Sequence, residues 1–286
     1  MADRIHARQY ATPRRCSRRL LNEDRHNMST RLSLSRFFAF SAAGFATFFA
    51  VWTGFAASGV ISPQFLPTPL TVIERFVQLT HTPFGGYTLQ QHLASSFGRF
   101  AAGFGLAVAI GIPLGLMMGW FRRLDAIVSP VFDALRFIAP IAWVPFAALW
   151  FGTGIGGPVL IIFSGAFPPC VINAYRGAKY VEPRLIEAAQ TLGASHRRMI
   201  TEVLLPASVP SIVAGLRISA GLGWQSLVGA ELIVASSGIG YLLVRGQANI
   251  STSTVMSGMI AIGMVGFVID ALLRALEARV QRRRGR

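Results

Sequence analysis

Long apolar runs separated by short polar segments dominate the chain between residues 37 and 273. Two of these runs, residues 37–57 and 100–120, extend for 21 residues without a charged side chain. A helix needs about 20 predominantly apolar residues to cross the hydrocarbon core of a bilayer. The runs show no alternation of period two, so helices are favoured over the strands of a barrel.

A third uncharged run, residues 137–175, is too long for one span, and the segment GTGIGGP at 152–158 interrupts it. Because glycine and proline favour tight turns, this run is interpreted as two spans joined by a turn. Two further runs, 203–230 and 253–273, contain one charge each. The sequence therefore predicts an all-α fold, a polytopic membrane protein with six transmembrane helices at about residues 37–57, 100–120, 137–151, 158–175, 210–233 and 253–273.

Composition and charge support this prediction. The chain is 52% hydrophobic and 14% charged, whereas about a quarter of the residues of a soluble domain are charged. Six spans place both termini on one side of the membrane. The tails and loops of that side contain 23 of the 27 lysines and arginines, and the opposite loops contain 3. The positive-inside rule therefore puts both termini and the loop 176–209 in the cytoplasm.

The predicted membrane domain covers residues 37–274, with a basic cytoplasmic tail on each side of it, 1–36 and 275–286. The first tail has no apolar core of its own and is expected to be disordered. Met28 is an alternative start to Met1.

The sequence contains no pattern typical of soluble catalysis. The net charge of +15 comes from arginines in tails and loops, which favours membrane topology over nucleic-acid binding. Two cysteines and five histidines show no disulfide framework and no metal-ligand spacing. The only lysine, Lys179, follows Ala178, so the Gly-Lys pair of a phosphate-binding P-loop is missing. A G-x-G-x-x-G match at 152–157 joins two membrane runs and is interpreted as a turn. No catalytic residue, metal or cofactor is predicted.

The loop 176–209 has the pattern of two short helices. Pro183 suits the start of the first helix, and Gly193 suits its end in a left-handed conformation. Ser195 can cap the second helix, and Pro206 marks the entry to the fifth span. An apolar stripe at helical spacing runs along the first helix and consists of Leu185, Ala188, Ala189 and Leu192. In isolation, this pattern also fits a hairpin that rests on lipid.

Ionisable residues inside a membrane are costly and are often functional. Glu231 either lines a pathway through the membrane or pairs with Arg245. Arg217 is expected to extend to the cytoplasmic surface, and Asp270 is expected to pair with Arg274 at i, i+4.

Two further features lie within the spans. Trp224 and Gln225 are candidates for pathway lining, with packing as the alternative. Gly111, Gly115 and Gly119 recur every four residues, which favours close approach of a neighbouring helix, either within the chain or in a second copy.

The loop also carries a motif. Glu187-Ala188-Ala189 is followed after three residues by Gly193 and after nine more by Val203-x-Leu205-Pro206. This string resembles the EAA loop of ABC importer permeases. The segments 61–69, 136–152 and 221–233 resemble the nitrate/sulfonate/taurine type of that family, with the taurine-like members most similar. The resemblance covers residues 60–275. The departures are the extended basic N-terminus and Val203, where isoleucine is more common.

The resemblance implies a coupling helix in the loop 176–209 that contacts a separate ATP-hydrolysing subunit, with Glu187 against a basic residue of that subunit. The residues that carry this implied role are Glu187, Ala188, Ala189, Gly193, Ala194, Leu205 and Pro206. The implied partners are two ATPase subunits, a second permease copy, a periplasmic or extracellular substrate-binding protein and the lipid bilayer. The implied location is the bacterial cytoplasmic (inner) membrane.

The implied function is transport of a small organic anion, sulfonate-like or taurine-like, with nitrate or an aromatic carboxylate as the alternative substrates. Two other classes of function remain. An ATP-independent secondary transporter or channel requires ionisable residues near the membrane midplane, and the chain has few of them. A membrane anchor without a transport role does not require an ordered cytoplasmic hairpin.

Overall fold

A computed structural model describes residues 34–152 and 154–284, and the chain divides after Val60 into two compact units. The first unit contains helix α2 (Leu34–Ala57), which includes the predicted span 37–57. Its large apolar side chains are exposed, as suits a helix that lipid surrounds. The disorder expected for the N-terminal tail falls on residues 1–33, which lie outside the described residues, and on the first residues of α2.

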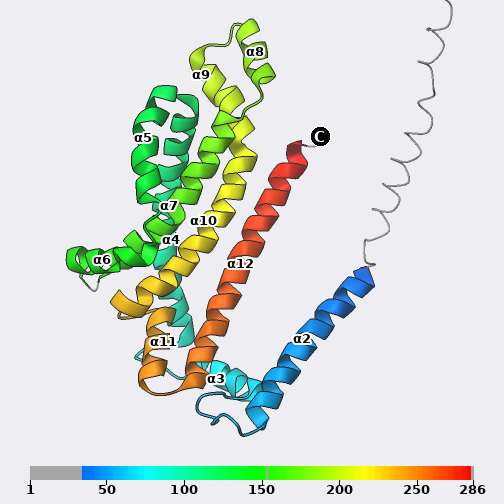
Figure 1. Cartoon of the computed structure of the whole chain (residues 1–286), viewed down its shortest axis with the longest axis vertical. Coiled ribbons are helices and arrows are strands. Elements are labelled where there is room, and N and C mark those ends of the chain that lie inside the picture. Colours follow the sequence, from blue (N-terminus) through cyan, green and yellow to red (C-terminus); the bar gives the residue numbers. More distant parts are fainter. Residues whose placement is uncertain (1–33, 153, 285–286) are drawn as a thin grey trace, which may run out of the picture. The chain divides into compact units, whose positions relative to one another are not determined.

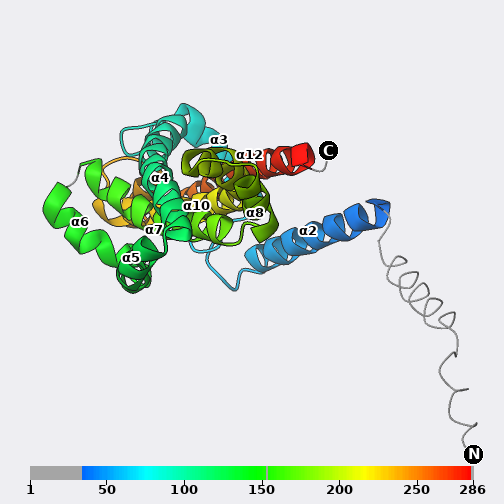
Figure 2. The same ribbon diagram turned by 90° about the horizontal axis from the view of Figure 1, so that it is seen from above.

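The second unit is a bundle of helices of very different lengths (Figure 1). In chain order these are α3 (Pro69–His81), α4 (Leu89–Trp120), α5 (Arg122–Leu135), the 3-10 turn η1 (Pro140–Trp143), α6 (Val144–Phe151), α7 (Gly156–Lys179), α8 (Pro183–Thr191), α9 (His196–Arg198), the π-helix η2 (Met199–Leu204), α10 (Leu205–Val234), α11 (Ile239–Ala248) and α12 (Thr252–Arg284). Seen from above, α5 and α6 lie on one side of α7, whereas α10 and α12 lie on the other side (Figure 2).

Glycines on α4 bring it close to α7. A Cβ atom on Gly111 would lie 2.9 Å from Cβ of Cys170, and one on Gly115 would lie 2.8 Å from Cβ of Ala174. A Cβ atom on Gly119 would overlap α7 in the same way. The predicted glycine face is therefore confirmed as a contact within the chain. Small residues allow this approach, and dispersion contacts replace the hydrophobic driving force that lipid does not supply.

The third predicted span, 137–151, does not form one straight helix. Residues 140–151 form η1 and the eight-residue α6, which is about 12 Å long and too short to cross a bilayer. Helix α5, in the segment expected to be a loop, forms a pair with η1 and α6 that is bent by 85°. The described residues therefore contain five helices that can span a membrane, or six when the bent pair counts as one.

Three other helices extend beyond their predicted ends. Helix α4 begins at Leu89 rather than near residue 100. Its start is capped by the side chain of Gln91, which accepts a hydrogen bond from the backbone N–H of Thr88. Helix α12 continues to Arg284, through most of the predicted tail 275–286. Helix α10 continues directly from α9 and η2, so one helical rod runs from His196 to Ile233.

Candidate functional site

The loop 176–209 forms a helical hairpin at the end of the bundle where α12 also ends (Figure 1). Helix α8 begins at Pro183, as predicted. It closes with two backbone bonds: Gly193 N–H donates to the Gln190 carbonyl at 2.9 Å, and Ala194 N–H donates to the Ala189 carbonyl at 3.0 Å. Gly193 has a φ of +72°. This is a Schellman motif, and it confirms that a left-handed glycine ends the helix.

One face of α8 is exposed and is not covered by residues 34–152 and 154–284. Ile186 packs toward the bundle, whereas Glu187 and Ala188 are exposed. Leu192, at the tip of the hairpin, is 86% exposed. The predicted apolar stripe is thus a largely exposed surface, with only Ala189 half-buried. A leucine exposed to this degree outside the apolar spans is available for contact with another molecule.

The hairpin is joined firmly to the long helices. Ile186 and Ile200 pack on a buried cluster that contains Ala178, Val181 and Leu204. The side chain of His196 lies against the end of α4, where its ring centroid is 5.8 Å from that of Trp120. The indole N–H of Trp120 donates to His196 Nε2 at 3.4 Å. A displacement of the hairpin would therefore reach α4 and α7 through packed side chains and α10 through a continuous helix.

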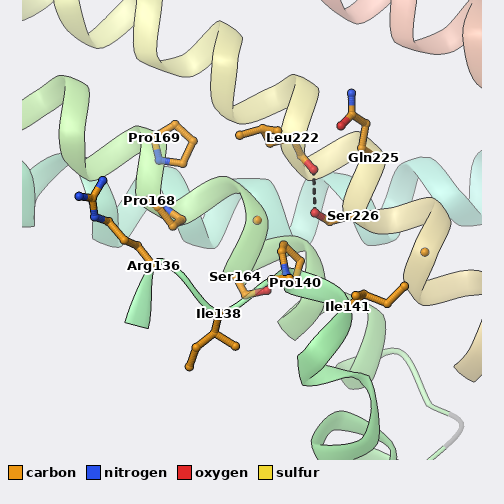
Figure 3. A pocket seen from close by; sticks show the side chains of 13 residues that line it. Arg136, Ile138, Pro140, Ile141, Ser164, Pro168, Pro169, Leu222, Gln225 and Ser226 are labelled. Carbon is orange, nitrogen blue, oxygen red and sulfur yellow. Dashed lines mark hydrogen bonds between the residues drawn. The ribbon is translucent and has the colours of Figure 1, made fainter. Parts of the chain in front are cut away.

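The exposed face of α10 borders two hollows. The first has a volume of about 370 Å³ and is shown in Figure 3. The second has a volume of about 440 Å³ and lies beside Arg217 and Asp270. Leu222 and Gln225 line both hollows. Of the two mid-span candidates, Gln225 is exposed on this face. Trp224 is buried in the core, where its indole N–H donates to the Ile262 carbonyl at 3.1 Å.

Charged side chains join α10 to α12 beside the second hollow. Arg217 Nε lies 2.6 Å from an Asp270 carboxylate oxygen, and Arg217 NH1 lies 3.5 Å from Glu277. Arg217 therefore pairs across helices, a partnership that the sequence analysis did not predict. The predicted pair of Asp270 and Arg274 is confirmed at 2.5 Å.

Glu231 lies at the opposite end of the bundle, where it is 1% exposed. It does not pair with Arg245, whose guanidinium lies over the Tyr241 ring. Its partner is Arg99, with NH1 2.8 Å from Glu231 Oε1. The Ser96 hydroxyl and the backbone N–H of Gly240 also donate to the carboxylate, at 2.8 and 3.0 Å. A buried charge with this many partners is satisfied within the chain.

The same network holds the start of α11. Gly238 N–H donates to His92 Nδ1 at 3.1 Å, and Ile239 N–H donates to the Ser96 hydroxyl at 2.9 Å. Because Nδ1 accepts, Nε2 of His92 carries the proton and donates to the Phe84 carbonyl. The orphan N–H groups at the helix start are thereby satisfied.

Sequence reasoning missed Arg99, Ser96 and His92. In chain order, His92, Ser96 and Arg99 lie at positions i, i+4 and i+7 ahead of an apolar run, so they share one face of α4. That polar stripe was the signal that could have found them. No group of three metal-ligating side chains occurs in residues 34–152 and 154–284.

These features define a membrane transport subunit: long apolar helices, hollows along one exposed helix face, and a helical hairpin with a free surface. Residues 111–285 match the family described as "Binding-protein-dependent transport system inner membrane component". The chain belongs to this family of ABC importer permeases and is a multi-pass inner-membrane transport subunit rather than an enzyme.

Two relatives extend the comparison. The taurine transport system permease protein TauC of Escherichia coli (strain K12) is 36% identical over 264 residues, which are 91% of this chain and 96% of TauC. The bicarbonate transport system permease protein CmpB of Synechococcus elongatus is 34% identical over 243 residues, which are 82% of this chain and 86% of CmpB.

Among solved structures, the methionine ABC transporter MetNI in an inward-facing conformation contains a chain with a similar fold. Its TM-score is 0.59 at 17% sequence identity, and the match covers 67% of this chain and 95% of that chain. The fold of an ABC importer permease is thus shared at low identity.

Proposed function

We propose that the chain forms the translocation pathway of an ABC importer for a small organic anion of the sulfonate class, driven by a separate ATPase subunit that docks on α8. The observation that carries this proposal is the exposed surface of the hairpin. Its fixed glycine turn, its acid at Glu187 and its leucine at Leu192 are not covered by the described chain, although the opposite side of the hairpin is well packed.

The proposed orientation follows from charge. The hairpin and the end of α12 lie at the same end of the bundle (Figure 1). Arginines concentrate in the segments assigned to that side, so we place it in the cytoplasm, together with both termini. The end of the bundle with α3 and α11 then faces outward, where a substrate-binding protein docks.

The proposed assembly contains two permease copies and two ATPase subunits. The hollows on the exposed face of α10 support a second copy, because one chain leaves them open and a pathway requires walls on all sides. Residues Gln225, Leu222 and Ser226 then face the pathway. The substrate class is supported by similarity to TauC, whose name specifies taurine transport.

Co-purification tests the docking surface. The permease is expressed with its ATPase subunit, solubilised and captured through a tag on the permease. Glu187→Arg reverses the charge on the exposed face of α8, and the ATPase is expected to be lost. Glu202→Arg is the matched control, since Glu202 is an exposed acid on the same hairpin outside α8.

The control variant is expected to retain the ATPase at the wild-type ratio. Equal retention of the ATPase by wild type and Glu187→Arg would contradict docking on α8.

A further inference from the structure

The first hollow lies at a break in the helices. It is lined by the bend between α5 and α6, by the middle of α7 and by the exposed face of α10 (Figure 3). Broken helices tend to form ligand sites in membrane transporters, because they expose backbone polar groups at a depth where water is scarce. The volume of about 370 Å³ is sufficient for a small organic molecule.

The hollow has one cationic side chain. Arg136 lies at the edge of the hollow near Pro168 and Pro169 (Figure 3). Its Nε lies 2.8 Å from an Asp133 carboxylate oxygen, and its guanidinium stacks over the Phe137 ring, 4.8 Å from the centroid. Neither Asp133 nor Phe137 lines the hollow. Among the described residues, only Nε of Arg136 is paired with an acid, so the two terminal amino groups remain available as donors for an acidic group.

The same hollow has acceptors that lack a helical donor. Pro168 and Pro169 have no backbone N–H, so the carbonyls of Ser164 and Gly165, four residues earlier, have no i+4 partner in α7. Ser164 and Gly165 both line the hollow. The Ser226 hydroxyl donates its proton to the Leu222 carbonyl at 2.7 Å (Figure 3), which leaves its oxygen lone pairs as acceptors.

Gln225 adds a side-chain amide to the lining, and the other walls are apolar. Ile138, Ile141 and Leu222 contribute side chains without donors or acceptors. A ligand that suits all three parts of the hollow has an acidic group for Arg136, a short apolar body and an N–H group for the acceptors. A small inorganic anion satisfies only the first of these requirements.

On this basis we infer that the hollow at the α5–α6 bend is a substrate site within the pathway that takes a small amino acid-like zwitterion, an amino sulfonate or amino carboxylate, with Arg136 binding the acidic group. This inference rests on the proposed transport function and adds a site in the permease itself to it.

Equilibrium binding to the full-length permease tests the site. The permease is reconstituted in lipid nanodiscs, and isothermal titration calorimetry measures the binding of taurine, ethanesulfonate and bicarbonate. Taurine is expected to bind the wild type most tightly, because ethanesulfonate lacks the N–H group and bicarbonate lacks both the N–H group and the apolar body.

Arg136→Gln is expected to raise the dissociation constant for taurine by about tenfold or more, which corresponds to about 1.4 kcal/mol. Arg136→Lys retains the charge without the planar guanidinium, and its dissociation constant for taurine is expected to lie between those of the wild type and Arg136→Gln. Arg123→Gln is the matched control, because Arg123 is an exposed arginine in the first turn of α5, the helix that Arg136 follows, and it lines neither hollow. Its dissociation constant is expected to equal that of the wild type.

Three results would overturn the site: no saturable taurine binding by the wild type, equal binding of taurine by wild type and Arg136→Gln, or bicarbonate binding as tight as that of taurine. Co-purification of the ATPase separates this failure from failure of the transport proposal. A wild type that retains the ATPase on α8 but does not bind taurine loses only the substrate site. Loss of docking on α8 with intact taurine binding contradicts only the proposed coupling.

Discussion

The two ends of the second unit differ in whether their acidic side chains are buried and paired or exposed. At the α11 end, Glu231 is 1% exposed and is bound by Arg99, by Ser96 and by the start of α11. At the hairpin end, Glu187 is exposed and forms no ion pair with the part of the chain that the structure describes, and Leu192 is 86% exposed.

The difference shows which end of the unit has its polar groups paired within the described chain and which end leaves side chains uncovered. No side-chain nitrogen or oxygen that is buried in the described residues lacks a hydrogen-bond partner, so the α11 end is satisfied without another molecule. The hairpin is fixed by local backbone bonds and by one packed side, and its other side leaves Leu192 exposed. Substitutions at the first end are therefore expected to act on stability, and those at the second on association.

The largest effect is expected from Arg99→Met. This change leaves the Glu231 carboxylate buried without its counter-charge, and loss of one partner of a buried ion pair costs about 3–5 kcal/mol. The measurement is the midpoint of unfolding of the purified permease in detergent, by denaturant titration.

Two controls accompany this variant. Arg123→Met removes an exposed arginine and is expected to leave the midpoint unchanged. The double variant Arg99→Met with Glu231→Met is expected to recover part of the loss, because no charge then remains buried. An Arg99→Met midpoint equal to that of Arg123→Met would remove the distinction between the two ends.

A smaller loss of stability is expected from Gly115→Val, in the α4–α7 contact that lies between the two ends. The new Cβ atom would lie 2.8 Å from Cβ of Ala174 and would overlap the Val171 carbonyl. Overpacking of this kind costs about 1–3 kcal/mol. Gly105→Val is the control on the same helix, since a Cβ atom there has no neighbour within 4 Å. Equal unfolding midpoints for the two variants would show that α4 and α7 separate readily.

The smallest effect on stability is expected from Gly193→Ala at the hairpin turn. A left-handed residue with a side chain costs about 1–2 kcal/mol, and this cost falls on a local turn rather than on the bundle. The global midpoint is expected to stay near the wild-type value while the yield of co-purified ATPase falls. Gly263→Ala on α12 adds a methyl group in open space and is expected to change neither quantity. A Gly193→Ala variant with a lowered unfolding midpoint and a wild-type yield of ATPase would contradict the assignment of this turn to association rather than to stability.

Local features were predicted well from the sequence. The start of α8 at Pro183 and its end at Gly193 depend on proline and glycine backbone geometry, which neighbouring residues decide. The glycine face of α4 and the Asp270–Arg274 pair follow from helical spacing alone. The family followed from the motif in the same hairpin.

Features that join distant segments were predicted poorly. Glu231 was assigned to Arg245 or to a pathway, because sequence proximity and apolar surroundings were the only guides, and Arg99 lies 132 residues away. The bend between α5 and α6 was missed for a similar reason. Residues 137–151 are apolar enough to span a membrane, and only packing against α7 shows that η1 and α6 turn away from α5 by 85°.

The sequence alone determined that the chain forms long apolar helices and where the hairpin turns, because hydrophobic length and backbone conformation are properties of adjacent residues. The tertiary structure decided which charges become partners and which surface remains open. Arg99 meets Glu231, and Arg217 meets Asp270, only after helices far apart in the chain pack together. Since a buried charge is stable only beside its partner, the pairing of Arg99 with Glu231 is set by the fold as a whole.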